Sequence, residues 1–392
     1  MNNTLYKQII LEHQLLRPIS QKKYTVEDVI KKLSYIQIDS LNIVNRAHHH
    51  TLWNRVDGYE IGELNKLVEH KKIFEYWFHA ASYLPMSDYR FALVNMNAVK
   101  NGKSRYYQNV EQKDIVYVLD KIKAEGALKA RDFKSTNKEK RTWWNFKPYK
   151  NALEKLFMQG DLMACRRDGI EKVFDLKSRV LPNDMDVKEP TLHEYAEYLI
   201  DATLKAHGVA SLQQILHLKT NAPLKKQMQI ILKQKLHEGT IEEHALNDNV
   251  LFCFKGTLEV ASDKRDDYLK ILSPFDNAVI HREKLKDIFT FDYKIECYTP
   301  KEKRVFGYFS LPILFNDSFV ARADCKAFRD EEVLEIIHLH FEKSMTDIVV
   351  FSKLFAKEIK QYAMFNRCNE VRLKEVSPKQ YFQTIETKLK EV

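Results

Sequence analysis

Apolar and polar residues follow two different periods along this chain, and the clearest change of period comes after Pro148. Pro148 suits the first position of a helix, and apolar residues recur at helical spacing from there to Gly160. Residues 162–165 and 170–176 then read as two short strands, and residues 166–169 between them end in Asp-Gly, which is typical of a hairpin turn. A helix followed by a strand, a basic turn and a second strand predicts a winged helix.

The same order of elements recurs on both sides of this segment. Downstream, the pattern predicts helices over residues 193–208, 211–218 and 223–237 and strands near residues 240–246 and 250–254. Upstream, residues 25–28 look like the start of a helix. Repetition of one small unit predicts tandem winged helices.

Beyond Ser273 the pattern changes to strands, which are expected over residues 294–299, 305–315 and 318–328, with a mainly helical tail from Lys343. We therefore predict an α+β fold in which tandem winged-helix domains precede a small C-terminal β-rich, barrel-like domain. The predicted domains are residues 1–110, which are winged-helix-like, residues 111–185 and 186–272, which are two further winged helices, and residues 273–392, which are β-rich with a terminal helix.

Composition supports a modular globular protein. The 392 residues exceed what one hydrophobic core usually organises, and 44% of them are hydrophobic and 30% charged. No stretch is apolar enough to span a membrane and the start does not resemble a secretory signal, so we expect a cytoplasmic protein. The five cysteines form no C-x-x-C pair, which argues against disulfides or a cysteine-based zinc site and favours buried thiols.

Positive charge is concentrated in one part of the chain. The net charge is +9, and residues 100–160 hold fifteen Lys and Arg against seven Asp and Glu. This segment is either a solvated face or a phosphate-binding surface. Candidate phosphate contacts are Lys147 and the wing residues Arg166 and Arg167. The aromatic residues 143–149 either stack on nucleotides or belong to a core.

The segment Ser34 to Ser40 carries the most informative polar pair. If the segment is extended, strict alternation places Gln37 and Asp39 on one face, away from Ile36 and Ile38. The pair is then either a site where an amide and a carboxylate cooperate or the polar side of an ordinary half-buried strand.

Two further groups have more than one interpretation. Arg322, Asp324 and Lys326 share one face of a predicted strand, where they either meet a polyanion or form a cross-strand charge ladder. The run His48-His49-His50 cannot direct all three rings at one ion from a helix, and no H-E-x-x-H motif accompanies it, so we expect no metal site.

A wider resemblance covers most of the chain. It is carried, in order, by QIDSLNIVNRAHHHTLWNR, EYWFHAASYLP, WWNFKPYKNALEKLFMQGDLMACRRDGIEKVFDLKSRVLP, SPFDNAVIHRE and FDYKIECYTPKEKRVFGYFSLPILF. These blocks resemble the YcaQ/AlkZ-type bacterial DNA glycosylases, a family of tandem winged helices with a C-terminal β-rich domain. The family's catalytic motif of a glutamine, an apolar residue and an acid or second glutamine maps onto Gln37, Ile38 and Asp39. An acid at the third position of the motif, here Asp39, is typical of the YcaQ-like branch, which the chain therefore resembles.

The resemblance implies a monomeric, monofunctional DNA glycosylase without cofactor or metal. Such an enzyme hydrolyses the N-glycosidic bond of alkylated purines of the N7-alkylguanine type, unhooks interstrand crosslinks and leaves an abasic site in double-stranded DNA. It implies catalytic roles for Gln37 and Asp39 and a location in the bacterial cytoplasm, on the nucleoid. The expected DNA contacts are Arg46, His48, His49, Lys147, Arg166, Arg167, Arg322 and Lys326, although Arg46, His48 and His49 fit a surface or capping role equally well.

Two other functions remain open from the sequence. A winged-helix transcription regulator or structural DNA-binding protein would have the same architecture without catalysis. A metal-dependent hydrolase that uses the histidines is the third alternative. A regulator prefers one operator sequence, whereas a repair enzyme binds most duplexes with a steep salt dependence.

Overall fold

The computed structural model describes residues 3–18, 23–103, 107–133, 147–247, 249–259 and 266–391. The chain forms two compact units. Unit 1 comprises Met1–Thr25, Ile36–Tyr59 and Leu199–Val392, and unit 2 comprises Val26–Tyr35 and Glu60–Tyr198. The chain therefore leaves unit 1 and returns to it twice.

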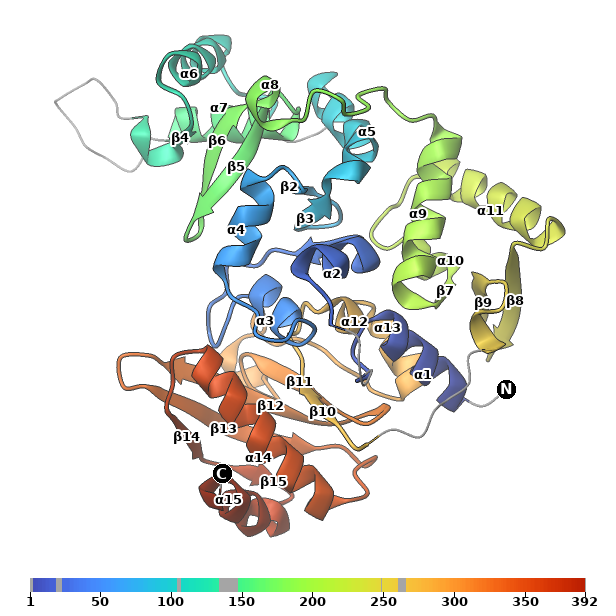
Figure 1. Cartoon of the computed structure of the whole chain (residues 1–392), viewed down its shortest axis with the longest axis vertical. Coiled ribbons are helices and arrows are strands. Elements are labelled where there is room, and N and C mark those ends of the chain that lie inside the picture. The colour runs from blue at the N-terminus through green and yellow to red at the C-terminus, as the bar shows by residue number, and fades with distance from the viewer. Residues whose placement is uncertain are drawn as a thin grey trace. The chain divides into compact units, whose positions relative to one another are not determined.

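Unit 2 combines helices with two small antiparallel sheets (Figure 1). Its helices are α2 (Val26–Leu33), α4 (Gly62–Glu69), α5 (Tyr89–Lys100), α6 (Gln112–Glu125), α7 (Lys147–Met158) and α8 (Lys177–Val180). Its strands are β2 (Ile73–Trp77), β3 (Ala81–Pro85), β4 (Leu128–Lys129), β5 (Leu162–Asp168) and β6 (Glu171–Leu176). The hairpin β2–β3 and the sheet β4-β6-β5 share one hydrophobic core with α5, α6 and α7.

The helix and hairpin predicted after Pro148 are present, but the turn is shorter than predicted. Helix α7 gives way at Gly160, whose φ of +80° places a hypothetical Cβ 2.6 Å from the Sδ of Met96. Strand β5 continues to Asp168, so the predicted turn over residues 166–169 is wrong, and the loop is Gly169-Ile170. Gly169 supplies the positive φ of +64° that so short a hairpin loop requires. Arg166 and Arg167 consequently lie on the strand itself.

Residues 192–254, most of which belong to unit 1, contain the other predicted helix and hairpin pattern. Helix α9 (Leu192–His207) runs across the boundary of the units, and β7 (Val209–Ser211), α10 (Leu212–Ile215), α11 (Ala222–His237), β8 (Ile241–Leu246) and β9 (Asn249–Phe254) follow. The strands form the antiparallel sheet β7-β9-β8. The sequence dictates two of the helix starts, because Ser211 forms a capping box with Gln214 and the Asn221 side chain accepts from Leu224 N–H. The predicted order of helices and strands in this segment is confirmed.

The C-terminal part of unit 1 is built on a six-stranded sheet. The sheet runs in the order β10-β11-β12-β13-β14, β15 also pairs with β13, and β14 and β15 are parallel to β13. The strands are β10 (Leu269–Ile271), β11 (Ser310–Phe315), β12 (Ser318–Phe328), β13 (Val333–Phe341), β14 (Glu370–Leu373) and β15 (Val376–Ser377). Helix α14 (Ile348–Phe365) packs on this sheet and α15 (Phe382–Glu391) packs on α14 (Figure 1).

Two sequence predictions for this region need correction. Residues 294–299 form a loop rather than a strand, because the Glu296 carboxylate accepts hydrogen bonds from the backbone N–H groups of Val305 and Phe306. Strand β11 also begins at Ser310, five residues later than predicted. The remaining elements of unit 1 are α1 (Asn3–His13), β1 (Ile36–Gln37), α3 (Ala47–Trp53), α12 (Asn277–Ile280) and α13 (Arg282–Phe289).

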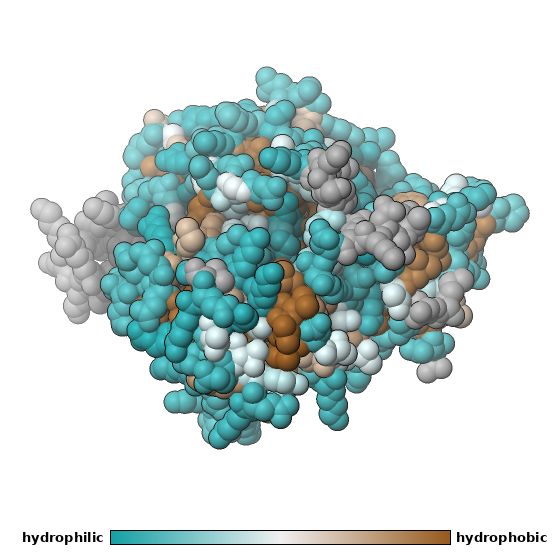
Figure 2. Space-filling view, turned by 60° about the horizontal axis from the view of Figure 1, so that its bottom comes forward, coloured by the Kyte–Doolittle hydropathy of each residue, from teal (hydrophilic) through white to brown (hydrophobic). Residues whose placement is uncertain are grey.

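The chain is thus a mixed α and β protein, as predicted. In the part that the structure describes, no helix combines the length and apolarity needed to cross a membrane. The face drawn in Figure 2 is mostly hydrophilic, with hydrophobic side chains in separate areas. Of the five thiols, those of Cys253, Cys325 and Cys368 are buried as predicted, whereas Cys165 and Cys297 are half-buried. The four-domain division stays a prediction.

Candidate active site

The Gln37 and Asp39 segment lies in unit 1, where β1 ends. Ile36 is fully buried and anchors the segment, while Gln37, Ile38 and Asp39 are half-buried. Strand geometry stops after Gln37, because the Asp39 Oδ2 accepts a hydrogen bond from the backbone N–H of Leu41 at 3.2 Å and closes a local turn. The carboxylate is therefore held by its own backbone.

The residues after Asp39 fasten this turn to the six-stranded sheet. The backbone N–H of Ala327, on β12, donates to the carbonyl of Ile43 at 3.0 Å. The Arg329 guanidinium donates to the carbonyl of Val44, which is fully buried in the core of the sheet. Hydrogen bonds to the β-sheet therefore hold the chain just after Asp39. A catalytic side chain needs such a fixed position.

Burial sets the protonation chemistry of Asp39. Desolvation raises the pKa of the Asp39 carboxyl above its ordinary range, and the backbone N–H groups of Ser40 and Leu41 offset part of that rise. A desolvated carboxylate is poorly stabilised by water, so it gains more than a solvated one when a positive charge approaches. The site is suited to stabilising a developing cation.

Cys297 and Tyr298 share the electrostatic environment of Asp39. Partial desolvation raises the pKa of the Cys297 thiol and of the Tyr298 hydroxyl, and the negative charge of Asp39 raises each of them further. The sequence prediction missed these residues because it assigned them to a strand. The signal that could have found them is the run Tyr-Thr-Pro-Lys-Glu-Lys, in which an aromatic residue, a proline and two lysines are typical of an exposed loop.

The histidine run lies on α3, which contacts β1, and its rings are buried among protein groups. His49 Nδ1 is 2.8 Å from the hydroxyl of Tyr59, and burial together with the charge of Arg46 lowers the pKa of His49 to about 4. His50 Nε2 is 2.8 Å from the carbonyl of Ile271 and its Nδ1 is 2.9 Å from the hydroxyl of Tyr362. At neutral pH His49 is therefore uncharged.

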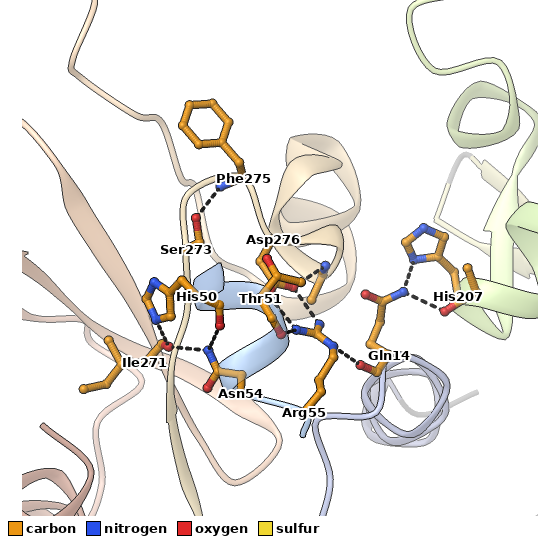
Figure 3. A network of polar contacts seen from close by, with 12 residues as sticks. Gln14, His50, Thr51, Asn54, Arg55, His207, Ile271, Ser273, Phe275 and Asp276 are labelled. Carbon is orange, nitrogen blue, oxygen red and sulfur yellow. Dashed lines mark hydrogen bonds and ion pairs between the residues drawn. The ribbon is translucent and has the colours of Figure 1, made fainter. Parts of the chain in front are cut away.

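A buried ion pair holds the end of this α3 segment in place. Arg55 and Asp276 form two hydrogen bonds of 2.7 Å, and both side chains are 0% exposed. Arg55 also donates to the carbonyls of Gln14 and Thr51, so Figure 3 shows it at the centre of the polar network. This network links α1, α3 and α12 within unit 1.

The predicted DNA contacts occupy different environments. The Arg166 side chain is 42% exposed, and Lys326 is exposed beside the Phe328 ring. Arg167 instead forms two hydrogen bonds of 2.7 Å with the buried Glu75 carboxylate. Lys147 begins α7, and the aromatic residues 143–146 lie outside the described residues.

Arg322 is 2% exposed and lies inside unit 1. Its Nε donates to Glu342 at 2.7 Å, and its guanidinium lies 3.9 Å from the centre of the Phe306 ring. The register shift between Asp324 and Cys325 breaks the alternation that placed Arg322 and Lys326 on one face. Exposure thus favours Arg166 and Lys326 as DNA contacts, and the contact role of all eight residues stays a prediction.

Metal-ligating side chains come together at a different place. Among the described residues, Glu242, His244 and Cys253 on the hairpin β8–β9 place one ligand atom each within 4.8 Å of one another. Burial and the charge of Glu242 raise the pKa of the Cys253 thiol to about 11, so a metal ion would have to displace its proton. The histidines of α3 do not belong to this group.

The comparisons with known proteins show the family to which the chain belongs. A sequence model of the family described as DNA glycosylase AlkZ-like matches residues 30–365, so the chain belongs to this family. The fold is similar to the solved structure of the Streptomyces sahachiroi DNA glycosylase AlkZ, with a TM-score of 0.62 and 17% identical residues over 96% of this chain and 100% of that chain. The protein is a DNA glycosylase, a hydrolase of DNA repair.

Proposed function

We propose that this DNA glycosylase hydrolyses the N-glycosidic bond of N7-alkylated purines in duplex DNA and unhooks interstrand crosslinks joined through the same atom. The observation that carries the proposal is the half-buried Asp39 carboxylate, fixed by its own backbone turn and raised in pKa by burial. A base alkylated at N7 already carries a positive charge, so the bond to it breaks with little protonation of the leaving group. The catalytic task is then to stabilise the sugar cation and supply water.

Asp39 and Gln37 divide that task. The Asp39 carboxylate stabilises the oxocarbenium-like sugar and orients or deprotonates the incoming water. The Gln37 amide holds the water or the carboxylate without adding charge. No lysine nucleophile is required, so the product is an abasic site and a free base.

The helix and hairpin units supply the DNA-binding architecture of this proposal. We interpret α7 with β5 and β6, and α11 with β8 and β9, as winged helices whose wings follow a DNA groove. Arg166 on β5, whose side chain is 42% exposed and pairs with Asp168, is expected to contact phosphate, whereas Arg167 maintains the wing through Glu75. The chain is expected to act as a monomer without metal or cofactor.

The test is release of the modified base. We expect the purified protein to convert a duplex that carries one N7-methylguanine into an alkali-labile abasic product under single-turnover conditions, faster than the duplex decays alone. A duplex with an N7-linked interstrand crosslink should yield two separable strands. An unmodified duplex of the same sequence is the control, and equal cleavage of both duplexes would contradict the proposal.

The pH dependence of this reaction is a second prediction. Because burial raises the pKa of Asp39, the excision rate should fall as the pH decreases through a midpoint above the ordinary aspartate value of about 3.9. The sign for stability is opposite: a carboxyl whose pKa is raised on folding favours the folded state more as the pH falls. Single-turnover rates from neutral to weakly acidic pH, corrected for spontaneous depurination, measure the midpoint. A rate that is flat down to the ordinary value would contradict this role of Asp39.

A further inference from the structure

The loop of residues 297–305, called the 297–305 loop below, exposes aromatic, apolar and basic side chains together. Tyr298 is 78% exposed and Val305 is 70% exposed, although both are large hydrophobic residues. Lys301 and Lys303 are exposed on the short 3-10 helix between them. Aromatic rings interleaved with cations are typical of surfaces that bind nucleic acids, because bases stack on the rings while phosphates contact the cations.

Glu296, which directly precedes the 297–305 loop, fixes the two ends of the loop to one another. The buried Glu296 carboxylate accepts from the backbone N–H of Val305 at 2.9 Å and of Phe306 at 2.7 Å. The Arg304 Nε donates to the Thr299 carbonyl at 2.8 Å, which closes the loop across its width. Tyr298 is therefore exposed on an ordered scaffold, and little conformational entropy would be lost when its ring met a ligand.

The residues that directly follow the loop are bonded to β12. The Asp324 carboxylate accepts from the backbone N–H groups of Tyr308 and Phe309 at 3.2 and 2.9 Å. Gly307, with a φ of +104°, lies against this carboxylate so closely that a Cβ would stand 2.0 Å from Asp324 Oδ2. A glycine is required at this position by both its φ and its contact.

The same strand holds the segment that carries Asp39. Ala327, which binds the carbonyl of Ile43, follows Asp324 by three residues on β12, or about 10 Å along a strand. The segment that follows the 297–305 loop and the segment that follows Asp39 are thus bonded to one strand, three residues apart. The charge of Asp39 accordingly reaches both Cys297 and Tyr298.

The Tyr298 ring is 78% exposed, although its loop is closed by the bonds of Glu296 and Arg304. An exposed aromatic ring on such a fixed loop has the form of a stacking platform.

We propose that the 297–305 loop binds DNA next to the scissile nucleotide and that the Tyr298 ring stacks on a nucleobase there. This inference rests on the proposed function, since it takes Asp39 to mark the reacting nucleotide. Lys301 and Lys303 contact the phosphates on either side of the stacked base. Tyr298 is then a residue that positions the substrate rather than one that takes part in the bond cleavage.

The experiment compares Tyr298→Ala with Tyr298→Phe in the full-length protein. Both are made in an Asp39→Asn background, so that binding is measured without turnover. The probe is a duplex with 2-aminopurine beside an N7-methylguanine. Tyr298→Ala should weaken binding about tenfold and abolish the quenching of 2-aminopurine by stacking, whereas Tyr298→Phe should stay within about threefold of its parent.

A matched control separates the loop from exposed side chains in general. Met364, on α14, is 67% exposed, and Met364→Ala should leave affinity and quenching unchanged. Equal affinity and equal quenching for Tyr298→Ala and its parent would overturn the inference. Should Tyr298→Ala melt at a lower temperature, Tyr298→Leu replaces it, because leucine keeps an apolar side chain but removes the aromatic face.

Failure of the proposed function gives a different result. A wild-type protein that releases no N7-methylguanine, together with a Tyr298→Ala variant that still loses quenching, would refute the proposed reaction and leave the loop as a DNA contact. For this comparison Tyr298→Ala is also made with Asp39 intact, and excision at the wild-type rate by that variant at limiting protein concentration would refute the role of the loop alone.

Discussion

Asp39→Asn should keep the fold and the DNA affinity but lose about 10²-fold or more in the rate of base excision. Asparagine is nearly isosteric with aspartate, and its side-chain oxygen can still accept the hydrogen bond that Leu41 N–H donates to Asp39. The negative charge disappears, and removing a charge directed at a developing cation commonly costs about 3 kcal/mol of transition-state stabilisation. Single-turnover release of N7-methylguanine, beside DNA affinity and thermal melting, measures the three quantities separately.

Binding of the Asp39→Asn variant should barely change, or tighten slightly because one negative charge near the phosphates is lost. Gln37→Ala is the matched comparison, and its rate should fall less, because an amide positions groups without neutralising charge. An Asp39→Asn variant that melts normally and excises within about threefold of wild type would show that Asp39 is not the catalytic carboxylate. Another group would then have to stabilise the sugar cation in this glycosylase.

The candidate catalytic pair could be predicted from sequence because its information is local. Gln37 and Asp39 are two residues apart, and the family motif places them without any knowledge of the fold. Whether each charged candidate is free to contact DNA depends instead on acidic partners that are distant in the sequence. Glu75 lies 92 residues from Arg167 and Glu342 lies 20 residues from Arg322, and no local pattern announces either pairing. From sequence alone, a basic residue in a predicted wing is therefore interpreted as a DNA contact. Only the structure shows whether an acidic residue already pairs with it.

The C-terminal region shows the opposite limit, where a local pattern misled. Residues 294–299 combine isoleucine, tyrosine and threonine as a strand does, yet they form a loop because the side chain of Glu296 captures backbone N–H groups nine and ten residues later. Helix periods were more informative, since α7, α9 and α11 lie where apolar spacing and caps place them. The loop that was predicted as a strand carries Tyr298, so the sequence pattern did not suggest this residue as part of the site.

Arg55→Met should lower the free energy of unfolding by about 3–5 kcal/mol, the largest stability effect that we expect of a single substitution here. The substitution leaves the fully buried Asp276 carboxylate without its cation and also frees the carbonyls of Gln14 and Thr51. Asp276 would retain one hydrogen bond, from the backbone N–H of Ala278 at the start of α12. One backbone contact cannot replace a bidentate guanidinium in a site closed to water.

Denaturant titration and thermal melting measure the effect, with two comparisons that isolate its cause. Arg372, whose side chain is 47% exposed, pairs with Glu370 at the surface, and Arg372→Met should leave the melting temperature almost unchanged. The double variant Arg55→Met with Asp276→Asn should be less destabilised than Arg55→Met alone, because no unpaired charge then remains buried and the α12 cap is kept. If Arg55→Met melts like wild type, the buried pair does not hold α1, α3 and α12 together, and the rigidity behind the Asp39 turn must come from the sheet alone.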